Sequence, residues 1–218
     1  MTAAVTAPLN LAAIRGATVH TQPWTYAIIG DTFASPAITE ALTISYPTHG
    51  FKRLSQTGTD KNFTLEARND ITLRGPNDPC PWQQLLRQLT DTPYRNALQA
   101  LTGADLTDAV LKIAFYRYGP DAWFSPHRDD ERKLLSHIFY FNTDWPEDIG
   151  GDLLINRSNR MLDTHTRVTP NAGTSVVVVR SDNSWHAVQR VDADAGRTRQ
   201  SLIAHFYQPG SDVSFYDS

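Results

Sequence analysis

The residues best suited to chemistry in this sequence are His127 and Asp129, which are separated by a single residue. Successive side chains of an extended backbone alternate between two faces, so this imidazole and this carboxylate can point to one ion. Of the seven histidines, only His127 has a carboxylate two residues further on. A lone His-x-Asp triplet is nevertheless common, and the charged sequence around it is also typical of a solvated surface loop. The pair predicts a metal site only if the fold supplies a third ligand.

His186 is the best candidate for that third ligand. It follows the apolar run 175–180, which is typical of a buried strand, and a polar turn at 182–184. Two imidazoles and one carboxylate on one side of an ion leave open positions, as in the facial sites of non-haem Fe(II) oxygenases. A set without cysteine does not resemble a structural zinc site. A zinc hydrolase could use the same three residues, but it would also need a general base.

Seven features follow one another between Leu111 and Gln208. They are the strand 112–119, His127-Arg-Asp129, the strand 138–145, and the segments 150–155, 170–173, 185–188 and 199–207. In this order they resemble the catalytic half of the Fe(II)/2-oxoglutarate dioxygenases, and most of all the prolyl hydroxylases, including the hypoxia-inducible-factor type. The resemblance implies that His127, Asp129 and His186 bind Fe(II). It also implies 2-oxoglutarate and O2 as cosubstrates, and ascorbate could stimulate turnover.

A buried 2-oxoglutarate needs a cation for its distal carboxylate, and arginine offers a bidentate match. The resemblance assigns this role to Arg199, because the segment 199–207 continues the match without a gap. Arg197 is the competitor, since the family arginine follows the second histidine more closely than Arg199 does here. A loop at 192–196 would account for the longer spacing between His186 and Arg199. For either residue, a surface pair with an aspartate is the alternative.

Three further residues are candidate contacts of 2-oxoglutarate. Alternation along a strand places Ser201 on the same face as Arg199, where it could donate to the same carboxylate. The resemblance matches Tyr140 to a tyrosine whose hydroxyl meets that carboxylate, and Tyr116 to a second tyrosine on the cosubstrate side. Either tyrosine could instead be a core aromatic residue with a polar tip.

The candidate substrate contacts are His205, Arg117 and Trp123. His205 stands where the prolyl hydroxylases typically carry a tryptophan beside the active site, although it could equally be a buried histidine satisfied by the barrel. Arg117 and Trp123 flank the expected mouth of the site. A closed pocket lined by these three residues would favour a small polar acid, whereas a large groove would favour a peptide.

The resemblance implies hydroxylation of an unactivated C–H bond, with succinate and CO2 as coproducts. We expect an amino acid or a natural-product intermediate as substrate, with protein or peptidyl prolyl hydroxylation as the alternative. A barrel that binds metal or ligand without turnover is the alternative from another class. Asp129 stands where related halogenases carry a small residue, which favours hydroxylation or desaturation over halogenation.

Composition restricts the partners and the compartment. The net charge of −3 and pI of about 6.1 provide no basic field for nucleic acid or an anionic membrane surface. No apolar run is long enough to predict a membrane span or a secretion signal. The single cysteine, Cys80, cannot form an internal disulfide and fits a reducing cytoplasm. We therefore expect a cytoplasmic protein that acts on a small molecule or a peptide, with the oligomeric state left open.

The chain of 218 residues is expected to form a single domain, 1–218. We expect residues 1–13 to be loosely ordered, 14–110 to form N-terminal strands and supporting helices, and 111–208 to form the catalytic core. Helices are predicted at 37–44, 82–89 and 94–101. Strands are predicted at 23–30, 111–118, 135–142, 152–156, 166–168, 174–180, 186–191 and 199–208, and residues 46–63 as loop with short strands. This pattern predicts a mainly β fold with flanking helices, a jelly-roll or cupin-like double-stranded β-helix.

Overall fold

The structure is a computed structural model that describes residues 7–69, 71–74, 78 and 80–213. The helices are α1 (Leu11–Gly16), α2 (Pro36–Ile44), α3 (Pro81–Thr90) and α4 (Thr92–Thr102), with a short 3-10 helix η1 (Glu147–Ile149). The first strands are β1 (Val19–His20), β2 (Tyr26–Ile29), β3 (Lys52–Gln56), β4 (Phe63–Arg68), β5 (Val110–Tyr118) and β6 (Trp123–His127). The others are β7 (Lys133–Tyr140), β8 (Leu153–Asn156), β9 (Thr164–Val168), β10 (Ser175–Val179), β11 (His186–Val188) and β12 (Arg199–Tyr207).

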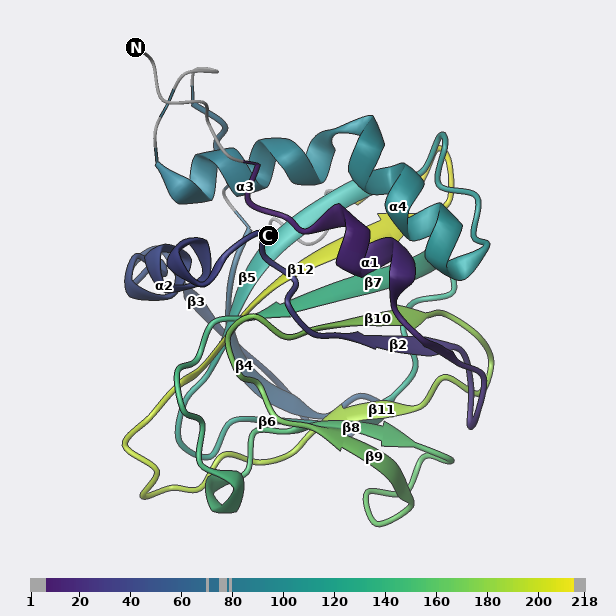
Figure 1. Cartoon of the computed structure of the whole chain (residues 1–218). Helices are drawn as coiled ribbons and strands as arrows, with labels where there is room; N and C mark the ends of the chain where they lie inside the picture. The colour runs from purple at the N-terminus through teal and green to yellow at the C-terminus, as the bar shows by residue number, and fades with distance from the viewer. Residues whose placement is uncertain (1–6, 70, 75–77, 79, 214–218) are drawn as a thin grey trace.

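The strands form one curled antiparallel sheet (Figure 1), in the order β1-β2-β10-β7-β12-β5-β4-β6-β11-β8-β9, with β3 beside β4. Strand β4 joins its two halves. Phe63 and Thr64 pair with β6, whereas the other end of β4, from Glu66 to Arg68, pairs with β5. The larger half of the sheet contains β1, β2, β10, β7, β12 and β5, and the smaller half contains β6, β11, β8 and β9. The sheet turns at β4, so that the two halves face each other as in a jelly-roll.

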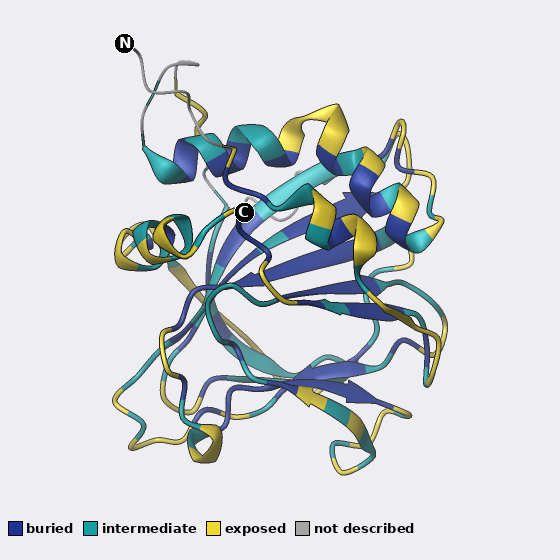
Figure 2. Cartoon of the chain, viewed as in Figure 1, coloured by how far each residue is buried: buried dark blue, intermediate teal, exposed yellow. Residues whose placement is uncertain are grey.

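Alternation along the central strands separates two cores. In β7, Phe139 faces the helices, while Ile138 and Tyr140 face the interior between the two halves of the sheet. The helices α1, α3 and α4 pack their apolar sides on the outer face of the larger half, and their opposite sides are exposed (Figure 2). The interior between the halves contains the second apolar core and, beside it, polar side chains and a cavity.

Local sequence explains where the helices begin and end. The Ser35 hydroxyl caps α2 by accepting a hydrogen bond from the backbone N–H of Ile38, and Pro36 occupies the first turn. Helix α4 ends at Thr102 and is followed by Gly103, whose φ of 74° is the left-handed conformation that favours glycine. The three predicted helices are therefore confirmed, each within two residues of the observed bounds.

The predicted fold class is confirmed, and most predicted strands agree with the structure to within two residues. The strand predicted at 23–30 begins only at Tyr26, and the one predicted at 186–191 already ends at Val188. Two strands flanking the site, β4 and β6, were not among those predicted. Every described strand belongs to one sheet. This observation supports a single domain, which stays a prediction.

The expectation of loose order for 1–13 is wrong for its last residues. Helix α1 starts at Leu11, and the Asn10 side chain caps it by accepting from the backbone N–H of Ala13. Ile14 then anchors the helix in the outer core, where it is fully buried. Residues 1–6 lie outside the described part of the chain. In that described part, no helix combines the length and apolarity needed to cross a membrane.

Candidate metal and cosubstrate site

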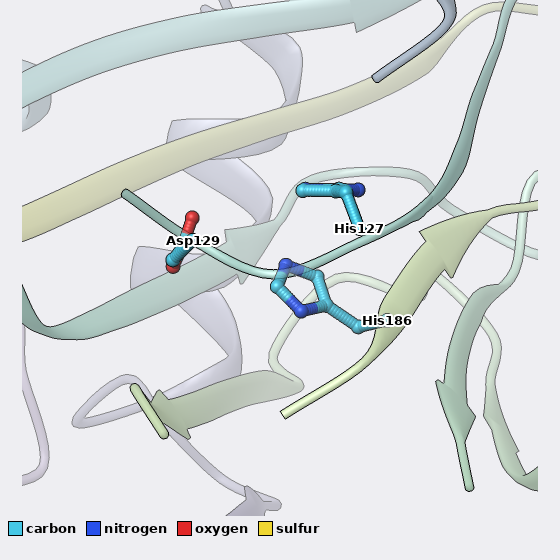
Figure 3. A group of neighbouring side chains, drawn as sticks. All are labelled: His127, Asp129 and His186. Atoms are coloured by element: carbon cyan, nitrogen blue, oxygen red, sulfur yellow. The ribbon is translucent and has the colours of Figure 1, made fainter. Parts of the chain in front are cut away.

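The fold brings His127, Asp129 and His186 together in the interior (Figure 3). His127 ends β6 and His186 begins β11, and the two residues are direct partners in the antiparallel pairing of these strands. Asp129 follows two residues after β6. One nitrogen or oxygen atom from each side chain lies within 4.8 Å of the others. All three side chains are buried, so the predicted metal ligands form one compact group.

Both histidines are oriented by backbone carbonyls. The Nδ1 atom of His127 lies 2.8 Å from the carbonyl oxygen of Ser125, and that of His186 lies 2.9 Å from the carbonyl oxygen of Ser184. A carbonyl oxygen only accepts, so each Nδ1 carries the proton and each Nε2 keeps a lone pair for an ion. Burial lowers the pKa of both imidazoles, and at His127 the neighbouring His186 lowers it further. Both rings are thus in the neutral form that binds metals.

Asp129 is held as a carboxylate by two donors. Lys133 Nζ lies 2.7 Å from Oδ1, and the Ser136 hydroxyl donates to Oδ2 at 2.8 Å. Burial alone would raise the pKa of Asp129, but the adjacent Lys133 ammonium holds it well below its usual value. Two neutral imidazoles and one anionic oxygen ligand fit a divalent ion such as Fe(II).

A cavity of about 320 Å³ opens beside these ligands and extends to Arg199. The Arg199 guanidinium carbon lies 5.0 Å from the ring centroids of both Tyr118 and Tyr140, and Nη1 donates to the Ser201 hydroxyl at 3.2 Å. Within the described chain, Arg199 Nε and the Tyr140 hydroxyl are buried without a hydrogen-bond partner. Burial raises the pKa of Tyr140 to about 12, so its hydroxyl stays a donor. A buried cation with unused donors fits a carboxylate ligand such as that of 2-oxoglutarate.

Arg197, the competing arginine, does not line this cavity. Its guanidinium donates to the backbone carbonyl oxygens of Thr143 and Asp144 and lies 5.6 Å from the ring centroid of Trp145. Of the two arginines, the structure therefore brings only Arg199 to the candidate site.

Tyr116 and His205 also line the cavity, and they continue a chain of hydrogen bonds to the metal ligands. Ser136 has a single hydroxyl hydrogen, which it gives to Asp129, so it must accept from His205 Nδ1 at 2.8 Å. His205 Nε2 is then an acceptor for the Tyr116 hydroxyl, 3.4 Å away. The chain Tyr116, His205, Ser136 and Asp129 thus has one consistent direction of donation.

Arg117 and Trp123, the other candidate substrate contacts, point away from this cavity, and their contact with substrate stays a prediction. Arg117 lies between two cavity-facing tyrosines of β5, so its side chain leaves from the opposite face. There it lies 3.4 Å from the Glu66 carboxylate and 4.9 Å from the ring centroid of Phe51. Trp123 instead packs against the guanidinium of Arg190, 4.9 Å from its ring centroid. Neither residue lines the cavity.

Sequence reasoning missed Lys61, Lys133 and Ser136 as residues of the cavity wall. Ser136 could have been found, because alternation from Tyr140 along the predicted strand gives Ile138 and then Ser136 on one face. Lys133 could not, since a shift in the pairing of β7 with β12 breaks the alternation after Leu135. Lys61 lies in the β3–β4 connection, and no pattern in the sequence singles it out.

Comparison with known proteins agrees with this geometry. A family model described as the 2OG-Fe(II) oxygenase superfamily matches residues 113–207, which include the three candidate metal ligands and Arg199. No protein of curated function matches the chain in sequence. The resemblance to this superfamily that the sequence motifs indicated is therefore confirmed.

Solved structures with the same fold include two prolyl hydroxylases. A Pseudomonas putida prolyl-4-hydroxylase has 21% identity and a TM-score of 0.60, with 91% of this chain and 99% of that chain covered. A prolyl hydroxylase from Trichoplax adhaerens, in complex with a peptide fragment of the hypoxia-inducible-factor oxygen degradation domain, has 15% identity and a TM-score of 0.58, covering 84% of this chain and 83% of that one.

A third similar structure is an α-ketoglutarate-dependent non-haem epimerase from nogalamycin biosynthesis. It has 13% identity and a TM-score of 0.55, and the match covers 95% of this chain and 85% of that one. At these identities the comparisons establish the fold, while the reaction and the substrate must be argued from the site.

Proposed function

We propose that this chain, which is similar to the 2OG-Fe(II) oxygenases over residues 113–207, is an Fe(II)- and 2-oxoglutarate-dependent dioxygenase. In the proposed reaction it hydroxylates an unactivated C–H bond of an amino acid or a natural-product intermediate and releases succinate and CO2. One observation carries the proposal: a single cavity joins two neutral imidazoles and a carboxylate to a buried arginine with unused donors.

Each residue has a definite task in this proposal. His127 and His186, through Nε2, and the Asp129 carboxylate would hold Fe(II), which together with 2-oxoglutarate and O2 supplies the oxidant. Arg199 would pair with the distal carboxylate of 2-oxoglutarate, helped by the hydroxyl groups of Tyr140 and Ser201. The apolar residues of the cavity wall, Ile138, Leu153, Val188 and Ile203, exclude water, which strengthens these charged interactions.

Peptidyl prolyl hydroxylation is the second candidate function. An open groove of about 750 Å³ adjoins the cavity, and the two share Lys61, His127, Asp129 and Asp130. A peptide could lie in this groove with one side chain directed to the metal ligands. The small interior cavity favours a small molecule, so we place this function second.

The substrate class can be tested by incubating the purified protein with Fe(II), 2-oxoglutarate and ascorbate and adding either pooled free amino acids or pooled prolyl peptides. We expect the amino-acid pool to raise succinate formation and one of its members to gain an oxygen atom in the mass spectrum. A gain confined to the prolyl peptides would favour the second candidate. Bound metal without turnover of either pool would favour a non-catalytic barrel.

Three expectations from the sequence stay predictions: a cytoplasmic location, the absence of nucleic-acid and membrane partners, and stimulation by ascorbate. Fractionation of cells, a binding assay with nucleic acid and lipid vesicles, and turnover with and without ascorbate would test them in turn.

A further inference from the structure

We propose that the cavity selects a small substrate with a free carboxylate, and that Lys133 and Lys61 bind this carboxylate. The inference rests on the proposed function, because it concerns the cavity that would hold iron and 2-oxoglutarate. It narrows the proposed substrates to small molecules with a free carboxylate, such as free amino acids and other small carboxylic acids.

Lys133 is a buried cation on the cavity wall. Its side chain is 8% exposed, and its ammonium group lies 2.7 Å from Asp129 Oδ1 and 5.8 Å from the ring centroid of Tyr207. Asp129 is its one carboxylate partner in the described chain. A divalent ion bound to Asp129 would share that negative charge. Lys133 would then need a further anion, since a buried ammonium without a full counter-charge is costly.

Lys61 brings a second ammonium group to the same cavity. The loop that carries it is fixed on β6: the backbone N–H of Asn62 donates to the Ser125 hydroxyl at 2.9 Å, and the backbone N–H of Ser125 donates to the carbonyl oxygen of Asn62 at 2.8 Å. Lys61 Nζ has no acceptor among the described residues. The loop therefore holds a cation at the junction of the cavity and the outer groove, where the Asp129 and Asp130 carboxylates act on it without a direct ion pair.

The charges of the loaded cavity favour an anion. A divalent ion, Asp129, Arg199 and a dianionic 2-oxoglutarate balance one another. Asp130, the other acidic group in the wall, is already engaged by the Arg132 guanidinium through contacts of 2.7 and 2.9 Å. The ammonium groups of Lys61 and Lys133 remain with a charge of +2, and a substrate carboxylate would neutralise half of it while accepting hydrogen bonds from both.

The size of the cavity favours a free acid over a peptide. Its volume of about 320 Å³ lies at the lower end of the roughly 300–1,000 Å³ of pockets that hold drug-sized ligands, and it must also hold 2-oxoglutarate. An internal peptide residue would present neutral amide groups to both lysines. A small carboxylic acid would satisfy them and still place its carbon skeleton against the apolar wall.

The test measures binding without turnover, by calorimetry on protein loaded with Mn²⁺ and 2-oxoglutarate. The probes are amino acids and small hydroxy and aromatic acids, each paired with its carboxamide, and a set of prolyl peptides. We expect at least one acid to bind roughly tenfold to hundredfold more tightly than its carboxamide. This range corresponds to the binding free energy that a hydrogen bond to a charged group contributes.

Variants then identify the lysines. Lys133→Met and Lys61→Met should each reduce the preference for acid over carboxamide about tenfold. This factor corresponds to the lower end of the free energy that a hydrogen bond to a charged group contributes. Lys52→Met is the matched control and should leave the preference unchanged, because Lys52 is exposed on β3 and lies outside the cavity. The ratio of two affinities cancels general damage to the protein.

Several outcomes would overturn the inference. They are carboxamides or prolyl peptides that bind as tightly as the acids, failure of every acid to bind, and a preference that survives in both lysine variants. A Lys133→Met variant that loses Mn²⁺ affinity but keeps the preference would show that Lys133 only positions Asp129. Failure of 2-oxoglutarate itself to bind the Mn²⁺-loaded protein would instead refute the proposed function.

Discussion

Replacing Arg199 with methionine should weaken 2-oxoglutarate binding strongly without destabilising the free protein. Arg199 is 2% exposed, lies between two tyrosine rings, and has no carboxylate partner among the described residues. Removing one member of a buried, hydrogen-bonded charge pair costs about 2–5 kcal/mol of binding free energy. The dissociation constant for 2-oxoglutarate should therefore rise about 30-fold to about 5,000-fold.

The stability of the ligand-free protein should not fall with this substitution. Without ligand, the Arg199 guanidinium is a buried charge with little compensation, so methionine at this position should leave the melting temperature unchanged or raise it. Addition of 2-oxoglutarate should raise the melting temperature of the wild type, because a ligand that binds only the folded state stabilises it. The variant should show little such increase.

Calorimetry with Mn²⁺-loaded protein measures the dissociation constants, and thermal unfolding with and without 2-oxoglutarate measures the stabilisation. Arg197→Met is the control, and its dissociation constant should remain near the wild-type value because that side chain lies outside the cavity. The assignment would be refuted if Arg199→Met bound 2-oxoglutarate as tightly as the wild type, or if Arg197→Met lost as much affinity as Arg199→Met.

Two further predictions concern stability. Burial lowers the pKa of His137, whose Nδ1 lies 2.9 Å from the Tyr94 hydroxyl, to about 3. Between pH 6.5 and pH 5 the unfolded chain therefore binds a proton that folded His137 does not, and this residue should lower the free energy of unfolding by about 2 kcal/mol. Urea unfolding at both pH values should show a smaller loss in His137→Gln, and an equal loss would refute the effect. At Gly150, with φ of 73°, an added Cβ would overlap the backbone carbonyl of Arg190. Gly150→Ala should cost about 2 kcal/mol or more. Gly196→Ala, which has open space, should cost less in the same urea assay, and a reversed order would contradict the clash.

Sequence patterns predicted the parts of the site that depend on local order. The spacing of His127 and Asp129 predicted that both side chains could bind one ion. Alternation from Arg199 predicted that His205 lies on the same face, and both residues line the cavity. Ser201, predicted on that face too, accepts a hydrogen bond from Arg199. The same alternation places Arg117 on the face opposite Tyr116, outside the cavity wall.

Other features depend on contacts that no local pattern specifies. The pairing of β6 with β11, which sets His186 opposite His127, joins residues far apart in the chain. Lys133 reaches the interior because of a shift in strand pairing, and Lys61 because hydrogen bonds between Asn62 and Ser125 fix its loop. These placements follow from tertiary packing, so the sequence did not indicate them.

The most direct test of the proposed oxygenase is succinate formation from 2-oxoglutarate by purified protein with Fe(II) and ascorbate, in the presence of the amino-acid and prolyl-peptide pools. The wild type should form succinate only when Fe(II) is present, and His127→Ala should fall to background. His165→Ala, which changes an exposed histidine outside the site, should retain wild-type turnover. Succinate formation that persisted in His127→Ala, or a wild type that bound neither iron nor 2-oxoglutarate, would contradict the account.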